Sequence, residues 1–242
     1  MIETRGPWAG PPDDHLVKVL PTLQTWVRLP SAWIGEKGLY QFEWARGTGS
    51  DNIAALMALM VIAHHAEQET GKVRLTWEEL CDRTSLSRAK ISKGLDILSE
   101  RGLISRGRDG RSRFQLANFN PAEGWAMLPS RGLYTRQGVV RAFNDFKLRS
   151  RAELDALKLY LLFAARRDRK LNAAVISYEK IWFYSGVHPN HIRTAISLLA
   201  SQGLVHVSLQ VSSQSEHGTA NLYRLAHLET TRHLGTIGRD LI

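Results

Sequence analysis

One segment of this 242-residue chain occurs twice, and this internal repeat limits the possible folds more than any other feature. When the numbering is shifted by 101, residues 53–106 align with residues 154–207 without a gap, and the apolar positions agree almost throughout. Leu98, for example, falls on Leu199. Because matched apolar positions imply matched buried faces, the chain is expected to contain two copies of one structural module.

A short motif lies ahead of each repeat, since "WVRLPS" begins at Trp26 and "WAMLPS" begins at Trp125. The segment "ANFNPAEG" between the copies contains Pro and Gly and is typical of a linker. The predicted organisation is a flexible N-terminal arm (1–23), a first copy (24–118), a linker (117–124), a second copy (119–227) and a C-terminal tail (228–242).

The first copy opens with an almost wholly apolar run, residues 53–63, which follows Ser50 and Asp51 as candidate N-caps. Such a run predicts a central helix that is covered on most sides. The next motif, "TWEEL", predicts a second helix with Thr76 as its cap and Glu79 three residues later, the pattern of a capping box.

A third helix is predicted after Ser87, and Gly102 is expected to end it in a left-handed cap. Its buried stripe is formed by Ile91, Leu95 and Leu98. The following "LISRGRDGRSRFQLANF" predicts two short strands around a turn at Asp109-Gly110. One copy therefore has the order helix, helix, turn, helix, hairpin.

This order is that of a winged helix-turn-helix, and the residues carry a resemblance to that family. The segment "SLSRAKISKGLDILSERGLISR" resembles the recognition-helix region of bacterial winged-helix regulators, and "GVHPNHIRTAISLLASQGLVHV" resembles a diverged form of it. The "WVRLPS" element is similar to the opening of winged-helix plasmid replication initiators. The resemblance implies a mainly α fold with small β wings (α+β), built of two tandem winged helix-turn-helix domains.

Charge favours a polyanionic partner, because the formal net charge is +9 and the sequence pI is near 9.9. On the third helix, Arg88 and Lys93 point outward and are candidates for guanine contacts in a major groove. Arginines of the hairpin are expected to bind phosphates or to enter a minor groove. The candidate DNA-binding residues of the first copy are Ser87, Arg88, Lys90, Ser92, Lys93, Arg106, Arg108, Arg111 and Arg113.

The second copy lacks this charge, since Arg193 is the only Lys or Arg between residues 184 and 214. Its third helix offers other hydrogen-bonding side chains, and Asn190 is suited to pairing with adenine. The candidate DNA-binding residues of the second copy are Asn190, His191, Arg193 and Thr194. Base reading by this copy and a role as a dimerisation or partner surface both remain open.

Other signals are discounted. His188 and His191 have metal-ligand spacing, but no third ligand is evident nearby, so no metal is expected. The adjacent His64 and His65 are interpreted as surface or capping residues. The tryptophans interpreted as core or strand residues are Trp26, Trp77, Trp125 and Trp182.

No catalytic motif is found, such as a phosphate-binding Gly-rich loop or a nucleophile elbow, so neither an enzyme nor a cofactor is expected. With Cys81 as the single cysteine, no internal disulfide is possible. The longest apolar run is about half the length that spans a bilayer, and no secretory signal is visible. The sequence thus predicts a cytoplasmic, nucleoid-associated bacterial protein with no membrane partner.

Three functions follow as hypotheses. The first is a sequence-specific transcription regulator that binds double-stranded DNA, with the first copy as the chief reader. The second is an origin-binding replication initiator of a plasmid or integrating element. The third is a winged-helix adaptor that binds proteins and not DNA. A homodimer and a contact with the replication or transcription machinery are compatible with the first two.

Overall fold

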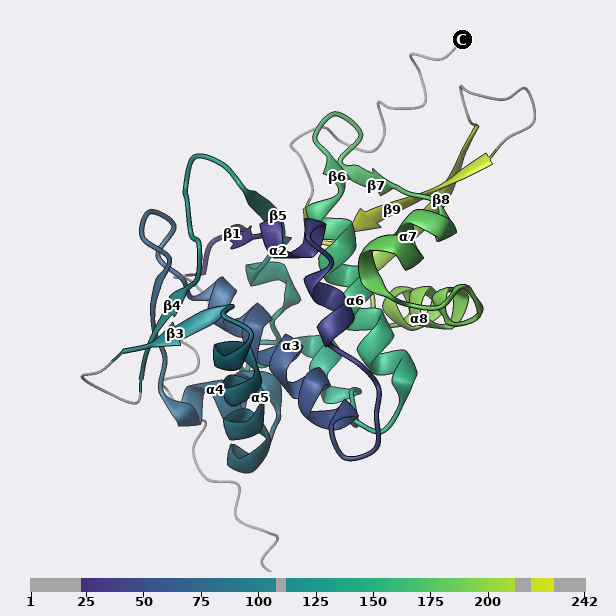
Figure 1. Ribbon diagram of the computed structural model, residues 1–242. Helices are drawn as coiled ribbons and strands as arrows, with labels where there is room; N and C mark the ends of the chain where they lie inside the picture. Colours follow the sequence, from purple (N-terminus) through teal and green to yellow (C-terminus); the bar gives the residue numbers. More distant parts are fainter. Residues whose placement is uncertain (1–22, 108–111, 212–218, 229–242) are drawn as a thin grey trace, which may run out of the picture.

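The computed structural model describes residues 23–107, 112–211 and 219–228. Within these ranges the chain forms seven α-helices and small antiparallel sheets (Figure 1). The coarse prediction of a mixed α+β fold is therefore confirmed. None of the helices in these ranges is long and apolar enough to cross a lipid bilayer.

The first copy contains short strands and helices around one long helix, α3. Its elements are β1 (Trp26–Pro30), α2 (Ala32–Gly35), the 3-10 helix η2 (Gly38–Gln41), α3 (Gly49–His64), β2 (Lys72–Arg74), α4 (Trp77–Thr84), α5 (Arg88–Glu100), β3 (Ile104–Arg106) and β4 (Arg113–Leu116). The three strands that follow α3 form one antiparallel sheet with the order β2-β4-β3.

The second copy is arranged around α6 in the same order. Its elements are β5 (Trp125–Pro129), the 3-10 helices η3 (Arg131–Leu133) and η4 (Arg141–Asn144), α6 (Arg151–Ala165), β6 (Arg167–Asp168), β7 (Ala173–Val175), α7 (Tyr178–Ser185), α8 (Pro189–Ser201), β8 (Val205–Val211) and β9 (Thr219–Leu225). A shift of 101 residues places β2 on β7, α4 on α7 and α5 on α8. The sheet order is β6-β7-β9-β8, so the shared strands are paired in the same way as in the first copy.

The two long helices lie at the centre of the molecule and pack against each other (Figure 1). Every residue of α3 from 52 to 64 is buried, and so is every residue of α6 from 153 to 164. This explains why the α3 sequence is apolar on all sides, since the shorter helices cover one flank and the other copy covers another. The buried side chains form one continuous core that contains residues of both copies.

A two-stranded ribbon also joins the copies. Strand β1 pairs with β5 in antiparallel register, with Trp26 opposite Pro129 and Arg28 opposite Met127. The rings of Trp26 and Trp125 stack with their centroids 5.9 Å apart, and the Arg28 guanidinium lies 5.8 and 5.2 Å from the two centroids. The repeated "W…LP" motif therefore serves as the joint between the copies.

The predicted caps are largely correct. Thr76 and Glu79 form the expected capping box at α4, and the Ser87 hydroxyl accepts a hydrogen bond from the backbone N–H of Lys90 at α5. Gly102 has the expected left-handed conformation, with φ at 64°. The N-cap predicted for α3, Ser50 or Asp51, is wrong, because the N-cap residue is Thr48 and the helix begins at Gly49.

The predictions for His64 and for Trp182 are wrong. His64 is buried and is hydrogen-bonded to the Tyr134 hydroxyl at 2.9 Å. His65 is the C-cap residue of α3, in agreement with the predicted capping role, and its Nε2 atom accepts a hydrogen bond from Arg83 at 2.8 Å. Tyr134 comes from the second copy, so the histidines face the interface between copies and not solvent. Trp182 is 50% exposed, because α7 turns this side chain outward.

Most of the predicted arm and tail lies outside the described residues. Leu23 and Leu228, where the described part begins and ends, are both buried. The predicted turn at Asp109-Gly110 also lies outside the described residues, as do Arg108 and Arg111.

Candidate nucleic-acid interface

Helix α5 packs closely against α3, and this packing fixes which of its side chains reach the surface. Ile91, Leu95 and Leu98 are buried as predicted. Gly94 allows the close approach, since a Cβ atom at this position would lie 2.9 Å from the backbone nitrogen of Ala55. The opposite side of α5 therefore faces solvent.

The outward side begins with two cations. Arg88 and Lys93 are exposed, and neither forms a salt bridge with any residue in the described ranges. The Arg88 guanidinium lies 5.9 Å from the ring centroid of Trp77, which gives it a platform on α4. Ser92 is half-buried between them on the same helix. Within the described residues, the N-terminal half of α5 therefore carries two exposed cations that form no salt bridge.

Lys90 is placed differently from its neighbours. Its Nζ atom lies 2.6 Å from Oδ1 of Asp51 and 2.7 Å from Oγ of Ser50, both in the first turn of α3. These two residues were predicted as caps, and here they accept hydrogen bonds from α5 instead. Lys90 is therefore engaged within the protein, and its predicted role in DNA contact gains no support from this geometry.

The strand pair β3–β4 carries Arg106 on β3 and Arg113 on β4, and both are exposed. Nη2 of Arg106 lies 2.8 Å from Oδ1 of Asp96, with both side chains partly exposed. Exposed ion pairs are weak, about 0–1 kcal/mol, so a phosphate can replace Asp96 at low free-energy cost. Arg113 forms no salt bridge within the described ranges.

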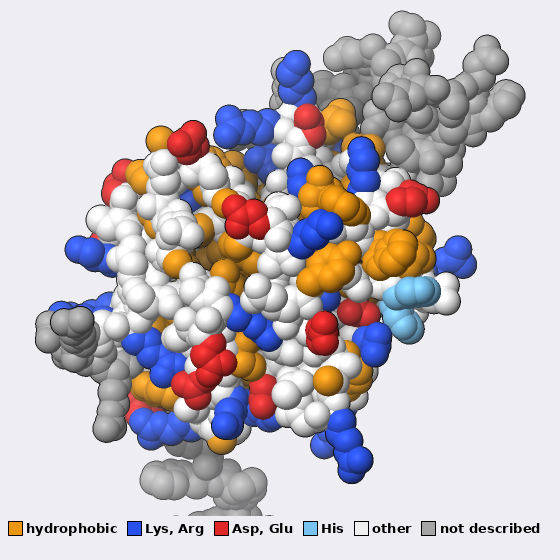
Figure 2. All heavy atoms as spheres, viewed as in Figure 1, with side chains coloured by type: hydrophobic (Ala, Val, Ile, Leu, Met, Phe, Trp, Pro, Cys, Tyr) orange, Lys and Arg blue, Asp and Glu red, His pale blue; other side chains and the backbone are white. Residues whose placement is uncertain are grey.

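A crevice beside the start of α5 is a feature that the sequence analysis missed. It has a volume of about 580 Å³ and is lined by Ser50, Ser87, Lys90, Lys147 and Arg149, among others. Because these residues lie at or just before the N-termini of α3, α5 and α6, three positive helix-dipole ends surround it. Such an arrangement of N-termini and cations favours phosphate oxygens. Figure 2 shows Lys and Arg side chains along this lower edge of the molecule.

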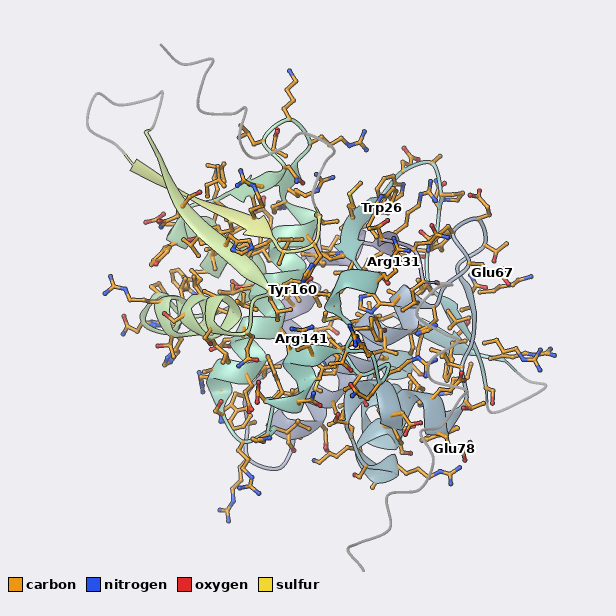
Figure 3. The ribbon with its side chains drawn as sticks, turned by 180° about the vertical axis from the view of Figure 1, so that it is seen from behind. Trp26, Glu67, Glu78, Arg131, Arg141 and Tyr160 are labelled. Atoms are coloured by element: carbon orange, nitrogen blue, oxygen red, sulfur yellow. The ribbon has the colours of Figure 1, made fainter. Side chains whose placement is uncertain are left out.

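Further cations lie on the segment that carries η3 and η4. Arg131 and Arg141 are exposed, and Figure 3 shows both near the middle of the rear face. The Ser85 hydroxyl donates a hydrogen bond to Oδ1 of Asn144 at 2.9 Å, so the end of η4 is attached to the turn between α4 and α5. The second copy thereby contacts the turn that precedes α5 in the first copy.

Helix α8 presents a surface with little charge. Asn190, His191, Arg193 and Thr194 are all exposed, as predicted from the helical spacing. His188 caps the helix, with its Nδ1 atom accepting a hydrogen bond from the backbone N–H of Asn190 at 3.3 Å. The donors and acceptors on this helix are thus available, but one arginine is the only cation among them.

The neighbouring helix α7 differs from its counterpart α4 in a way that bears on function. Trp182 and Phe183 are about half exposed, whereas Cys81 and Asp82 occupy the equivalent positions in the first copy. The ring centroids of Trp182 and His188 lie 6.3 Å apart, and Figure 2 shows hydrophobic side chains next to His side chains. The Lys37 ammonium lies 3.8 Å from the ring centroid of Phe183. The fold itself tolerates polar residues there, so the aromatic residues belong to a surface and not to the core.

No group of three or more His, Cys, Asp or Glu side chains that could hold a metal ion occurs within the described ranges. His188 and His191 have ring centroids 6.0 Å apart. No protein-family model matches this chain, and no curated protein matches its sequence significantly.

Proposed function

We propose that this protein binds double-stranded DNA in a sequence-specific manner and acts as a transcription regulator through two tandem winged helix-turn-helix modules. The observation that carries the proposal is the uncompensated charge of Arg88 and Lys93 at the exposed N-terminal half of α5. In a helix-turn-helix, this part of the second helix contacts base edges in the major groove.

The topology supports the same proposal. Helix α3 is followed by β2, α4, α5 and a strand pair, and β3, an edge strand of the sheet β2-β4-β3, contacts α5. A duplex seated on α5 would meet Arg113 on one side and the crevice with Lys147 and Arg149 on the other. Phosphate contacts on both sides of the helix would fix its register, while α5 would carry the sequence preference.

The alternative is an origin-binding replication initiator of a plasmid or integrating element. It is favoured by the motif that begins at Trp26, which forms β1 and resembles the opening of winged-helix plasmid replication initiators. A protein adaptor is the second alternative, and the exposed Trp182 and Phe183 favour a partner contact on the second copy. A contact there is compatible with DNA binding by the first copy.

The experiment is a selection of bound duplexes from a random pool and from the source genome. The full chain is used, because the shared core means that neither copy is expected to fold unchanged alone. A recovered motif that is lost in the Arg88→Ala/Lys93→Ala variant, and retained in an Arg169→Ala/Lys170→Ala control, would support the proposal. Single bound sites at promoters would favour a transcription regulator. Repeated bound sites beside a replication origin would favour an initiator. No enrichment at low salt would overturn DNA binding and leave the adaptor.

A further inference from the structure

We infer that the cavity between α2, η2 and the C-terminal end of α5 binds a small organic acid, with an apolar body and one carboxylate. The cavity has a volume of about 260 Å³. Its apolar walls are formed by Leu29, Trp33, Phe42, Leu59, Leu103 and Leu116. In Figure 2 a hollow with hydrophobic side chains inside it is visible between the positions of α2 and β4.

The carboxylate follows from Arg101, which also lines the cavity. Its guanidinium lies over the ring of Phe42, with Cζ 4.0 Å from the centroid, so one face of the group is already covered. Its Nη1 atom is buried and has no hydrogen-bond partner within the described ranges, and Arg101 forms no salt bridge there. The guanidinium as a whole is partly exposed and is stabilised by the charges of Glu43 and Glu100, but the buried Nη1 atom has no acceptor among the described residues, which is rare for a buried donor. A carboxylate is the common group whose charge and geometry match a guanidinium.

Size restricts the apolar body of the ligand. Pockets for drug-sized molecules have volumes of about 300–1,000 Å³, so this cavity suits a smaller ligand, such as one aromatic ring or a branched alkyl group with a short acid chain. Glu36 lines the cavity too, but its side chain lies on the exposed surface, where water screens its repulsion of an anion.

The position of the cavity connects it to both copies. Arg101 is the C-cap of α5, and Leu116 ends β4, so an occupant would touch the reading helix and the wing strand together. The opposite wall includes η2, where the Tyr40 hydroxyl donates a hydrogen bond to the backbone oxygen of Trp182 at 2.8 Å. A bound acid would thus contact η2, which is hydrogen-bonded to α7, and the C-terminal end of α5, and it could change the position of α5 relative to α7. The site stands on its own geometry and does not depend on DNA binding.

The test is isothermal titration of the full chain with benzoate, indole-3-acetate and 4-methylpentanoate, each beside its uncharged amide. At least one acid is expected to bind, and its amide should bind about 10- to 150-fold more weakly, because the amide lacks the charge that strengthens a hydrogen bond to Arg101. Arg101→Gln should lower the affinity for the acid to that for the amide and leave the amide unchanged.

Two further variants keep the test decisive if Arg101→Gln fails to fold. Ala32→Trp places a large side chain at an exposed position on the cavity rim, and it should weaken both acid and amide about tenfold or more. Arg166→Gln removes a cation from the other copy and should change neither. Equal affinity for acid and amide, unchanged acid binding in Ala32→Trp, or no binding of any of the three acids at millimolar concentration would overturn the inference.

Discussion

The Nζ atom of Lys90 lies 2.6 Å from Oδ1 of Asp51, and this ion pair joins the first turn of α5 to the first turn of α3. The side chains are 37% and 18% exposed, so the pair is only partly screened by water. Two basic residues on α5 thus differ: Lys90 forms an ion pair with α3, whereas Lys93 is exposed and can contact a partner.

Lys90→Ala should therefore lower the free energy of unfolding by about 1 kcal/mol, the upper range for a partly exposed ion pair. Lys93→Ala should leave stability unchanged within about 0.5 kcal/mol, because this exposed side chain has no ion-pair partner in the described ranges. Urea titration measures both. For affinity toward the preferred DNA site the expected order is the opposite: Lys93→Ala should cost about 1–3 kcal/mol, as expected for a lost guanine contact, and Lys90→Ala should change the affinity little. Equal losses of affinity in the two variants would contradict these roles.

Arg88 and Arg113 should differ in what they contribute to DNA affinity. Arg88→Ala is expected to cost about 1–3 kcal/mol on the preferred site and much less on random duplexes, because a base contact is lost. Arg113→Ala should weaken both by a similar factor, because a wing arginine contacts phosphate. Fluorescence anisotropy with the two duplexes measures the ratio. If Arg88→Ala leaves the preference intact, α5 is not the reading helix.

The crevice at the three helix N-termini gives a prediction that the sequence alone did not. Lys147→Gln combined with Arg149→Gln should reduce the salt slope of DNA binding by up to about 2, since two cations are removed from a phosphate path. The matched control, Arg169→Gln with Lys170→Gln, removes the same charge from the β6–β7 turn of the second copy. An equal loss in both variants would show a general charge effect and no site.

Stability should fall in mild acid because of the buried His64 and the partly buried His65. Burial lowers the pKa of His64 to about 3, and burial together with the nearby Arg83 charge lowers the pKa of His65 to about 3. The unfolded chain takes up these protons near pH 6.5 and the folded chain does not, so stability is full above about pH 6.5 and is lost as the pH falls toward 3. Each histidine contributes up to about 1.4 kcal/mol per pH unit in this window.

Urea denaturation between about pH 7.5 and pH 5 measures this slope. His191→Gln is the control, because this exposed histidine faces solvent, and it should leave the slope unchanged. A free energy of unfolding that stays flat over this range would show that the histidines are not buried as described.

Gly94→Ala should destabilise the protein by about 1–3 kcal/mol, because the added methyl group meets the α3 backbone and forces the helices apart. Gly35→Ala is a matched control at the end of α2, where an added Cβ atom meets no atom within 4 Å. It should be neutral or slightly stabilising. Thermal unfolding that is unchanged in Gly94→Ala would contradict the close approach of α3 and α5.

Features with local causes were predictable from the sequence. The capping box of Thr76 and Glu79, the cap at Ser87 and the left-handed Gly102 depend on residues within a few positions of each other. The outward face of α5 follows from its 3.6-residue period, so Arg88 and Lys93 were placed correctly on the surface.

Features with distant partners were not predictable. The buried His64 is hydrogen-bonded to Tyr134, which lies 70 residues away. Ser50 and Asp51 accept hydrogen bonds from Lys90, which lies 40 and 39 residues away. The exposure of Trp182 was missed because equivalence within the repeat suggested a shared core position. The crevice required Lys147 to be placed beside α5, and a pattern within one copy holds no such information.

The register of the β1–β5 ribbon is symmetric about its middle, since Trp26 faces Pro129, Arg28 faces Met127 and Pro30 faces Trp125. Two identical strands would pair in the same register across a two-fold axis. In a dimer of identical chains, however, every substitution at such a joint is made twice, and dilution separates the partners. Because β1 and β5 belong to one chain, a substitution can change one strand of the ribbon without changing the other. Dilution of the protein does not separate the two strands.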